Sequence, residues 1–304
     1  MEKSMETKVL EIIEFTDPVC TWCWGSEPVL RTLEARFGNR MKLSYIMGGL
    51  VKDITAFYDR HNNIGGDPDV SNKSIAAHWL EASERHGMPV NVEGFKLFSK
   101  EQTSTYPQNI AYKAAQMQNE VMANRFLRRM RVAAAAEARQ TNLTEVLVEL
   151  ASEAGLDIAR FLDDFTNGKA KAAFEEDLYI TAQFRAHGFP TFLIKYGEKS
   201  MLLRGYQSYN NFKAVINQVS NGELQEETVK PTEENVLEFI HQYDSLAPIE
   251  IQMPFNLSDA ELDNILHALV EKQLITKREA GNGYFISVKS NPMACDVETG
   301  VCKS

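Results

Sequence analysis

The first fifty residues change from a strand-like pattern to a helical one and back. Residues 9–15 are rich in β-branched and apolar side chains, which is typical of a buried strand. After Cys20, apolar residues recur at helical spacing as far as Gly38, where the pattern ends. A second strand-like stretch covers residues 42–47. This order predicts a βαβ unit with two parallel strands and a right-handed crossover.

The middle of the chain has a helical pattern, and strand character returns only after it. From about residue 71 to residue 187 the pattern predicts helices throughout. Two strands are expected at residues 191–195 and 200–204, and Ser208 should cap a helix at 209–219. The two ends of this region should therefore form one mixed sheet, with the helices inserted between them.

The last eighty residues have a pattern of their own. Residues 221–231 are rich in Gly, Glu and Lys and end in a proline, which is typical of a linker. Two predicted helices, 233–243 and 258–271, precede two short strands around a Gly-Asn-Gly turn, an arrangement that resembles a small winged helix. The predicted units are an α/β domain at 1–222 (helical insertion about 65–187), an acidic winged-helix-like α+β domain at 223–290 and a cysteine-containing tail at 291–304.

Composition narrows the class of protein. The chain has 304 residues, 44% hydrophobic and 24% charged, which is typical of a globular protein and excludes a disordered or low-complexity one. It has no run of 18 apolar residues, so no transmembrane helix and no membrane partner are expected. The charged N-terminus lacks the apolar core of a signal peptide, and the expected location is the cytoplasm.

The negative charge is concentrated near the C-terminus. The net charge is −10, and residues 223–304 contain 15 acidic and 6 basic residues, against 27 and 26 in residues 1–222. Neither region has the basic stripe that binding to a phosphate backbone requires, so nucleic acid is not an expected partner. The acidic C-terminal domain is instead expected to serve dimerisation or protein docking.

Candidate chemistry begins with a C-x-x-C motif formed by Cys20 and Cys23, which lies after a strand and at the start of a helix. The free N–H groups and the dipole of a helix N-terminus favour the thiolate form of the first cysteine. Cys20 should therefore attack a disulfide, and Cys23 should resolve the mixed disulfide. Three alternatives remain: half of a zinc site, a structural disulfide, or an inactive thiol pair on a binding protein.

A second motif supports the redox interpretation. The loop at 188–192, Gly-Phe-Pro-Thr-Phe, places Pro190 between a helix and a strand. Alone, a proline before a strand is a common turn. Together with a strand–C-x-x-C–helix unit more than 160 residues upstream, it becomes a specific signal.

The segments 15–38, 47–50 and 188–192 resemble the DsbA-like thioredoxin-fold family, in particular its cytosolic FrnE-like branch of predicted protein disulfide isomerases. The resemblance covers residues 8–220 and implies a thioredoxin domain interrupted by a large helical insertion. It implies that Cys20 is the nucleophile, Cys23 the resolving thiol and Pro190 a cis-proline. The proline loop should lie beside the C-x-x-C motif, with the backbone of residue 189 free to pair with substrate. The resemblance also implies that Glu14 is a buried acid that relays protons to Cys23; the alternative is an exposed glutamate on a strand.

The motif departs from the strongly oxidising members of the family. Thr21 and Trp22 stand between the cysteines in place of Pro-His, so strong oxidising power is not expected. Residue 189 is Phe, which either favours apolar segments of a substrate or only fills space. The expected substrate contacts are Trp22, Phe189 and Thr191.

Three smaller signals complete the set of candidates. Cys295 and Cys302, close to the C-terminus, are either a second redox pair or exposed thiols that oxidise incidentally. The six histidines have no metal-ligand spacing, so no metal site is expected. The basic cluster at 125–131, Arg-Phe-Leu-Arg-Arg-Met-Arg, is interpreted as a solvated helix face, with a contact to a partner as the alternative.

The sequence therefore predicts a cytoplasmic enzyme, a thiol–disulfide oxidoreductase that reduces or isomerises disulfides of protein or peptide substrates. No cofactor is expected, and glutathione or another thiol would donate electrons; a homodimer is left open. One alternative is a protease-adaptor-like protein that binds partners, keeps a redox-sensitive C-x-x-C and has no turnover. A glutathione-dependent isomerase or transferase is the other, although relatives with that activity have a serine where this chain has Cys20.

Overall fold

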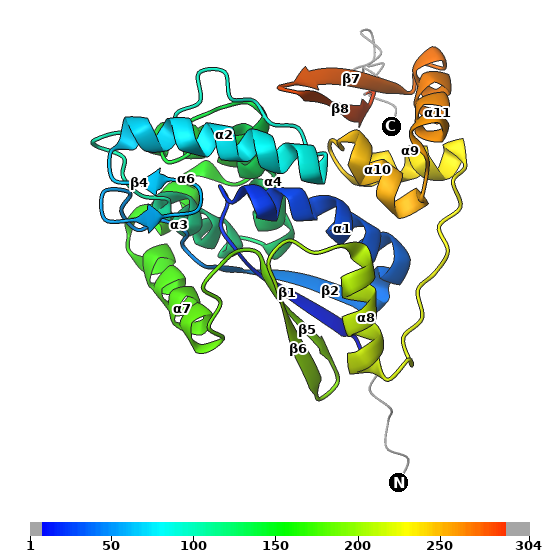
Figure 1. Ribbon diagram of the computed structural model, residues 1–304, viewed down its shortest axis with the longest axis horizontal. Helices are drawn as coiled ribbons and strands as arrows, with labels where there is room; N and C mark the ends of the chain where they lie inside the picture. The colour runs from blue at the N-terminus through cyan, green and yellow to red at the C-terminus, as the bar shows by residue number, and fades with distance from the viewer. Residues whose placement is uncertain (1–7, 290–304) are drawn as a thin grey trace, which may run out of the picture.

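The computed structural model describes residues 8–289, and a four-stranded mixed sheet lies at its centre (Figure 1). The strand order is β2-β1-β5-β6, with β1 and β2 parallel and the other neighbours antiparallel. The strands are β1 (Leu10–Thr16), β2 (Met41–Met47), β5 (Thr191–Tyr196) and β6 (Lys199–Arg204). The predicted sheet, assembled from both ends of the domain, is confirmed.

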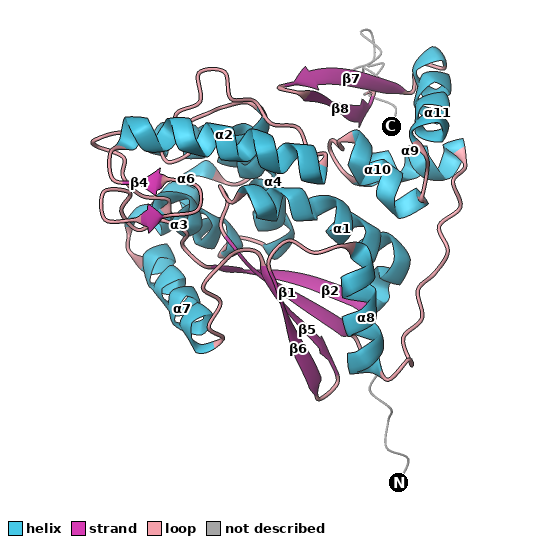
Figure 2. Cartoon of the chain, in the orientation of Figure 1, coloured by secondary structure: helices cyan, strands magenta, loops and turns pink. Residues whose placement is uncertain are grey.

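Helices α1 (Thr21–Phe37) and α8 (Tyr209–Ser220) pack against this sheet (Figure 2). Their apolar side chains enclose a core with the inward-facing residues of β1 and β5. At its centre the rings of Phe192 and Phe212 meet edge to face at 4.7 Å. Ser208 caps α8 as expected, because its side chain accepts a hydrogen bond from the Asn211 N–H. The fold is thioredoxin-like α/β.

The inserted helices lie between β2 and β5 in the sequence. They are α2 (Pro68–His86), α3 (Tyr106–Gln116), α4 (Glu120–Ala136), α5 (Thr144–Glu153), α6 (Ile158–Thr166) and α7 (Lys169–Gln183). All of them except α2 contribute to an apolar core that they share with β2. A two-stranded ribbon, β3 (Tyr58–Asp59) and β4 (Ile64–Gly65), precedes them. The predicted helical insertion is present, but residues 87–105 form no helix, contrary to the expectation of helices throughout.

Three helices and a hairpin form the C-terminal module, residues 233–288. They are α9 (Glu233–Gln242), α10 (Pro248–Phe255), α11 (Asp259–Glu271), β7 (Ile275–Ala280) and β8 (Gly283–Val288). The predicted hairpin and outer two helices are confirmed. Helix α10 has no counterpart among the predicted elements; it is only eight residues long and contains Pro248 and Pro254.

The C-terminal module packs on the thioredoxin body (Figure 1). Helix α10 lies against α1, and the rings of Trp24 and Phe285 are 6.2 Å apart. The hairpin turn contacts the body so closely that a Cβ at Gly281 would overlap the Val90 carbonyl. One apolar core contains residues of α1, α2 and the hairpin together, so the domain boundary at residue 222 stays a prediction. No helix among residues 8–289 is long and apolar enough to cross a membrane.

Candidate functional site

Cys20 occupies the N-cap position of α1, at the end of the loop that follows β1. Its backbone is extended there (φ −78°, ψ 114°), and its Sγ accepts a hydrogen bond from the Cys23 N–H at 3.2 Å. The sulfur therefore lies where the free N–H groups and the positive end of the helix dipole stabilise a thiolate. Cys20 is only 5% exposed, so a large substrate can reach its sulfur only if the surrounding side chains move.

Cys23 lies one turn further along α1 and is fully buried. Burial raises the pKa of the Cys23 thiol well above its ordinary value, and the hydrogen bond and charge of Cys20 and the charge of Glu14 raise it further. Both cysteines are free thiols in this structure. A resolving thiol at this position would need a nearby group to take its proton before it could attack Cys20.

The predicted meeting of the C-x-x-C motif and the proline loop is confirmed. The Phe189 carbonyl accepts a hydrogen bond from the Cys20 Sγ at 3.5 Å, across 169 residues of sequence. The Phe189–Pro190 peptide bond is cis, as the family resemblance implied. Thr191 is buried, and its hydroxyl donates to the Gly188 carbonyl at 2.7 Å, so its side chain stabilises the loop itself.

Phe189, whose carbonyl contacts Cys20, and Trp22, two residues after Cys20, are both half-buried. The Phe189 ring lies on Gly48, where any Cβ would overlap it. The ring of Trp22 contacts three aromatic rings at 5.5–6.1 Å, from Tyr206, His78 and His86. These three residues are absent from the sequence-based candidates because they come from α2 and from the segment after β6, and no local pattern marks them.

His86 is the buried member of this aromatic cluster, and its ring packs edge-on against Trp22. The His86 Nδ1 accepts a hydrogen bond from the Met88 N–H at 3.0 Å. Burial lowers the pKa of His86 to about 4, so the imidazole is neutral at physiological pH. His86 therefore adds no charge to the aromatic cluster beside Cys20, although the Arg85 guanidinium lies 5.9 Å from the centre of the Trp22 ring.

Glu14 lies on β1 and is fully buried, so the alternative of an exposed strand glutamate is wrong. Its Oε1 accepts hydrogen bonds from Thr16 at 2.9 Å and from the Arg131 guanidinium at 3.2 Å. Burial raises the pKa of Glu14 despite the attraction of Arg131. The buried Oε2 makes no hydrogen bond to any residue within 8–289, which leaves it able to hold a proton.

Arg131 belongs to the basic cluster at 125–131, which the sequence analysis interpreted as a solvated helix face. For Arg131 that interpretation is wrong. Its side chain is completely buried and forms ion pairs with Glu14 and Glu27. Burial alone would raise the pKa of Glu27, but the guanidinium groups of Arg131, Arg31 and Arg128 hold it at about 2. The cluster thus supplies the counter-charges of two buried carboxylates.

The charge network continues into the C-terminal module. Arg128 pairs with the fully buried Glu250 of α10 at 2.6 Å, and the same guanidinium lies 3.6 Å from Glu27. Arg31 reaches Glu250 at 3.8 Å. A continuous series of buried and partly buried charges therefore connects Glu14, near the resolving cysteine, with α10. The tail cysteines Cys295 and Cys302 lie outside the described residues, and their pairing stays a prediction.

The model of a family described as Thioredoxin matches residues 14–214 of this chain. The chain belongs to this thioredoxin family. A candidate protein disulfide isomerase from Nitrosomonas europaea superposes with a TM-score of 0.59, at 18% identity, over 71% of this chain and 100% of that one. The cytosolic disulfide reductase DsbM from Pseudomonas aeruginosa gives 0.50, at 21% identity, over 69% and 95%. These similarities confirm the DsbA-like thioredoxin fold, and the narrower FrnE-like branch stays a prediction.

One relative is similar over more of the chain than either structure. The ClpXP adapter protein SpxH from Halalkalibacterium halodurans is 26% identical over 275 residues, which are 90% of this chain and 86% of that protein. An alignment of that length has to extend into residues 223–304. The similarity therefore includes part of the region that carries the C-terminal module.

Proposed function

We propose that this protein is a protein-binding adaptor for an ATP-dependent protease, with a redox-sensitive C-x-x-C pair. The observation that supports this most is the similarity to SpxH, which extends past the thioredoxin domain into the C-terminal region. The C-terminal module shares an apolar core with α1 and α2, so both regions would present one continuous binding surface. The partners would be proteins, and the expected location is the cytoplasm.

The geometry around the cysteines also favours binding over rapid turnover. Cys20 is 5% exposed, and its neighbours Trp22 and Phe189 form an apolar surface. Aromatic side chains of this kind supply much of the free energy of protein–protein contacts. A partner that docks on this surface would lie against the thiol pair. Exchange with a disulfide, which is itself reduced to two thiols, would convert Cys20 and Cys23 to a disulfide and change the surface that the partner contacts.

A second function, thiol–disulfide exchange, is supported by the position of Cys20 at the N-cap of α1 and beside the Pro190 loop. The Cys20 thiolate would attack a substrate disulfide, form a mixed disulfide and release one substrate thiolate. Cys23, after losing its proton, would attack the Cys20 sulfur and release the second substrate thiolate. The chain would be left as the Cys20–Cys23 disulfide, and two electrons from glutathione or another thiol would restore the dithiol.

Glu14 is the group that would take the Cys23 proton in this exchange. Its raised pKa and its unpaired Oε2 suit a transient proton acceptor, and Arg131 stabilises its ionised form. No cofactor is required for either function. Isomerase activity would follow if Cys23 often failed to resolve the mixed disulfide and the substrate rearranged.

An experiment can distinguish the two functions because thiol–disulfide exchange requires the Cys20 thiol and adaptor activity does not. A protein that co-purifies with the chain would be supplied to ClpXP with the parent, with Cys20→Ser or with no adaptor. We expect faster degradation with the parent and with Cys20→Ser than without either, and few turnovers of the parent on a glutathionylated peptide. No acceleration, together with many turnovers that vanish in Cys20→Ser, would contradict the adaptor and establish the oxidoreductase.

A further inference from the structure

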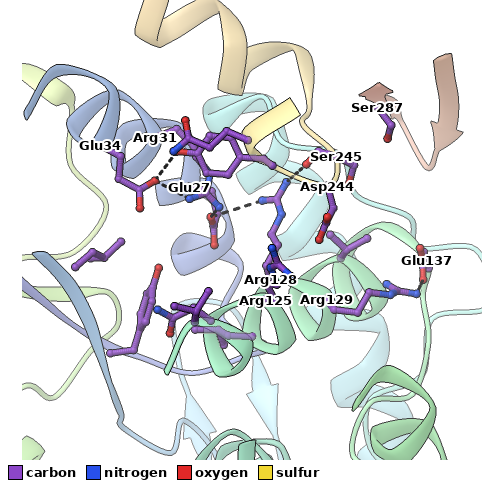
Figure 3. A pocket seen from close by; sticks show the side chains of 18 of the residues that line it. Glu27, Arg31, Glu34, Arg125, Arg128, Arg129, Glu137, Asp244, Ser245 and Ser287 are labelled. Atoms are coloured by element: carbon purple, nitrogen blue, oxygen red, sulfur yellow. Dashed lines mark hydrogen bonds and ion pairs between the residues drawn. The ribbon is translucent and has the colours of Figure 1, made fainter. Parts of the chain in front are cut away.

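A cavity of about 590 Å³ lies where the thioredoxin body meets the C-terminal module (Figure 3). Its walls come from α1, β2, α4, the residues that follow α9, and the β7–β8 hairpin. Pockets for small molecules have volumes of roughly 300–1,000 Å³, so this one is large enough for a ligand. Neither Cys20, Cys23 nor Pro190 lines it, so it is separate from the thiol site.

Arginine is concentrated around this cavity. Five of the fourteen arginines of the chain line it, and no lysine does. They are Arg31, Arg125, Arg128, Arg129 and Arg278. In a chain of net charge −10 this is a marked local excess of one side chain. The planar guanidinium binds carboxylate and phosphate groups through two parallel hydrogen bonds, which lysine cannot do.

Four of these arginines are held in place by ion pairs, and Arg31 and Arg128 also stack on aromatic rings. Arg31 donates to Glu34 at 2.8 Å and stacks on the Tyr243 ring, 4.2 Å from its centre. Arg128 pairs with Glu250 and lies 4.6 Å from the centre of the Trp24 ring. A ligand would meet guanidinium groups that are already ordered, so binding would cost little side-chain entropy.

Arg125 is the arginine left without a partner. It is exposed, and it makes no hydrogen bond or ion pair with any other residue between 8 and 289. Figure 3 shows it on α4 together with Arg128 and Arg129, across the cavity from Ser287 of the hairpin. All five of its N–H groups are available to a ligand.

The carboxylates of the cavity pair with the other four arginines and leave Arg125 to meet a ligand. Glu27, Glu34 and Glu137 line the cavity and are already paired with arginines. Asp244 is exposed and makes no ion pair within the described part of the chain, so it would repel an anion at its own end of the cavity. The remaining walls are apolar or neutral, with Leu43, Leu127 and Val132 among them.

We propose that this cavity binds a small organic anion through a carboxylate or phosphate group. Arg125 would donate two hydrogen bonds to the anionic group, next to Arg128 and Arg129 of the same helix, whose charges are already balanced by carboxylates. The apolar body of the ligand would lie on Leu43, Leu127 and Val132. This site is independent of thiol chemistry and of any protease, so it does not rest on the proposed function.

The test is calorimetric titration of the reduced full-length protein with two probes, succinate and inorganic phosphate, at constant ionic strength. We expect saturable binding of at least one probe, and the two arms show whether carboxylate or phosphate is recognised. Arg125→Gln should weaken binding at least about tenfold, which is about 1.4 kcal/mol.

Arg60→Gln is the matched control, because Arg60 is exposed and does not line the cavity. Arg60→Gln and Cys20→Ser should both bind like the parent. The proposal would be overturned if neither probe saturates, or if Arg125→Gln and Arg60→Gln weaken binding equally. The melting temperature of each variant, measured without probe, identifies any loss of binding that comes from unfolding.

Discussion

Arg131 and Glu14 form a completely buried ion pair across 117 residues of sequence, with 3.2 Å between the Arg131 Nη2 and the Glu14 Oε1. Arg131 comes from the helical insertion and Glu14 from the central strand, so the pair connects the two parts of the thioredoxin domain. The same guanidinium also donates to the Thr16 hydroxyl at 2.6 Å. The helical insertion therefore supplies the positive charge that pairs with a carboxylate buried on the sheet.

Replacing Arg131 with methionine should destabilise the protein strongly. Methionine keeps much of the volume but leaves Glu14 and Glu27 with less counter-charge in the interior. Removing one partner of a buried ion pair costs about 3–5 kcal/mol, because the remaining charge is uncompensated. The free energy of unfolding from urea titration measures this loss. Arg60→Met is the control, and a loss of less than about 1 kcal/mol in Arg131→Met would show that the pair contributes little.

Glu27 should make stability depend on pH in the acid range. Its pKa is about 2 in the folded protein, below its ordinary value of 4.5, because Arg131, Arg31 and Arg128 outweigh the effect of burial. A depressed carboxyl pKa contributes stability above pH 4.5, and that stability is lost as the pH falls toward 2. The shift corresponds to roughly 3 kcal/mol.

The measurement is the free energy of unfolding of parent and Glu27→Gln between pH 6 and pH 3. The parent should lose more stability over this range than Glu27→Gln, although Glu27→Gln is less stable at pH 6. Glu81→Gln removes an exposed carboxylate that pairs with Arg85, and it should keep the slope of the parent. Equal slopes for the parent and Glu27→Gln would contradict the assignment.

The sequence predicts those parts of the fold that depend on local patterns. The strands β1, β2, β5 and β6, the helix after Cys20 and the C-terminal hairpin all follow from periodicity and turn residues. The position of the Pro190 loop beside Cys20 was also predicted, because the family resemblance places that loop next to the motif, but the hydrogen bond from Cys20 to the Phe189 carbonyl was not. These features were predictable because they depend on local sequence patterns and on the known topology of the thioredoxin fold.

Long-range partners account for what the sequence does not predict. Arg131 belongs to a run of basic residues that looks solvated. The two carboxylates that pair with it in the interior lie 104 and 117 residues away in the sequence. Helix α10 is short and rich in proline, and packing against α1 stabilises it more than its own sequence does. The arginine cavity is assembled from five separate segments, so no single stretch of sequence indicates it.

His86 should remain neutral over the physiological pH range. Burial lowers its pKa to about 4, and it stands between Trp22 and Gly25, where a Cβ would overlap its ring. The NMR signal of the His86 ring, assigned by its loss in His86→Gln, should not move between pH 8 and pH 6 and should shift only as the pH approaches 4. A midpoint near 6.5 would show that water reaches the ring and that the aromatic cluster is open.

A methyl group at residue 48 should disturb the thiol site through Phe189. The Phe189 ring lies on Gly48 so closely that the Cβ of Gly48→Ala would overlap it, and the Phe189 carbonyl is the hydrogen-bond acceptor of Cys20. Overpacking of this kind costs about 1–3 kcal/mol. Gly48→Ala should lower the free energy of unfolding by that amount and change the rate at which iodoacetamide alkylates Cys20.

The control is the double variant Gly48→Ala with Phe189→Ala, because removing the ring also removes the overlap. In a double-mutant cycle the cost of Gly48→Ala should be largely lost in the Phe189→Ala background, which gives a coupling energy of roughly 1–3 kcal/mol. Phe189→Ala alone also shows how far the ring restricts access to Cys20. If the two substitutions were additive in both stability and alkylation rate, the ring on Gly48 would not be what positions the loop beside Cys20.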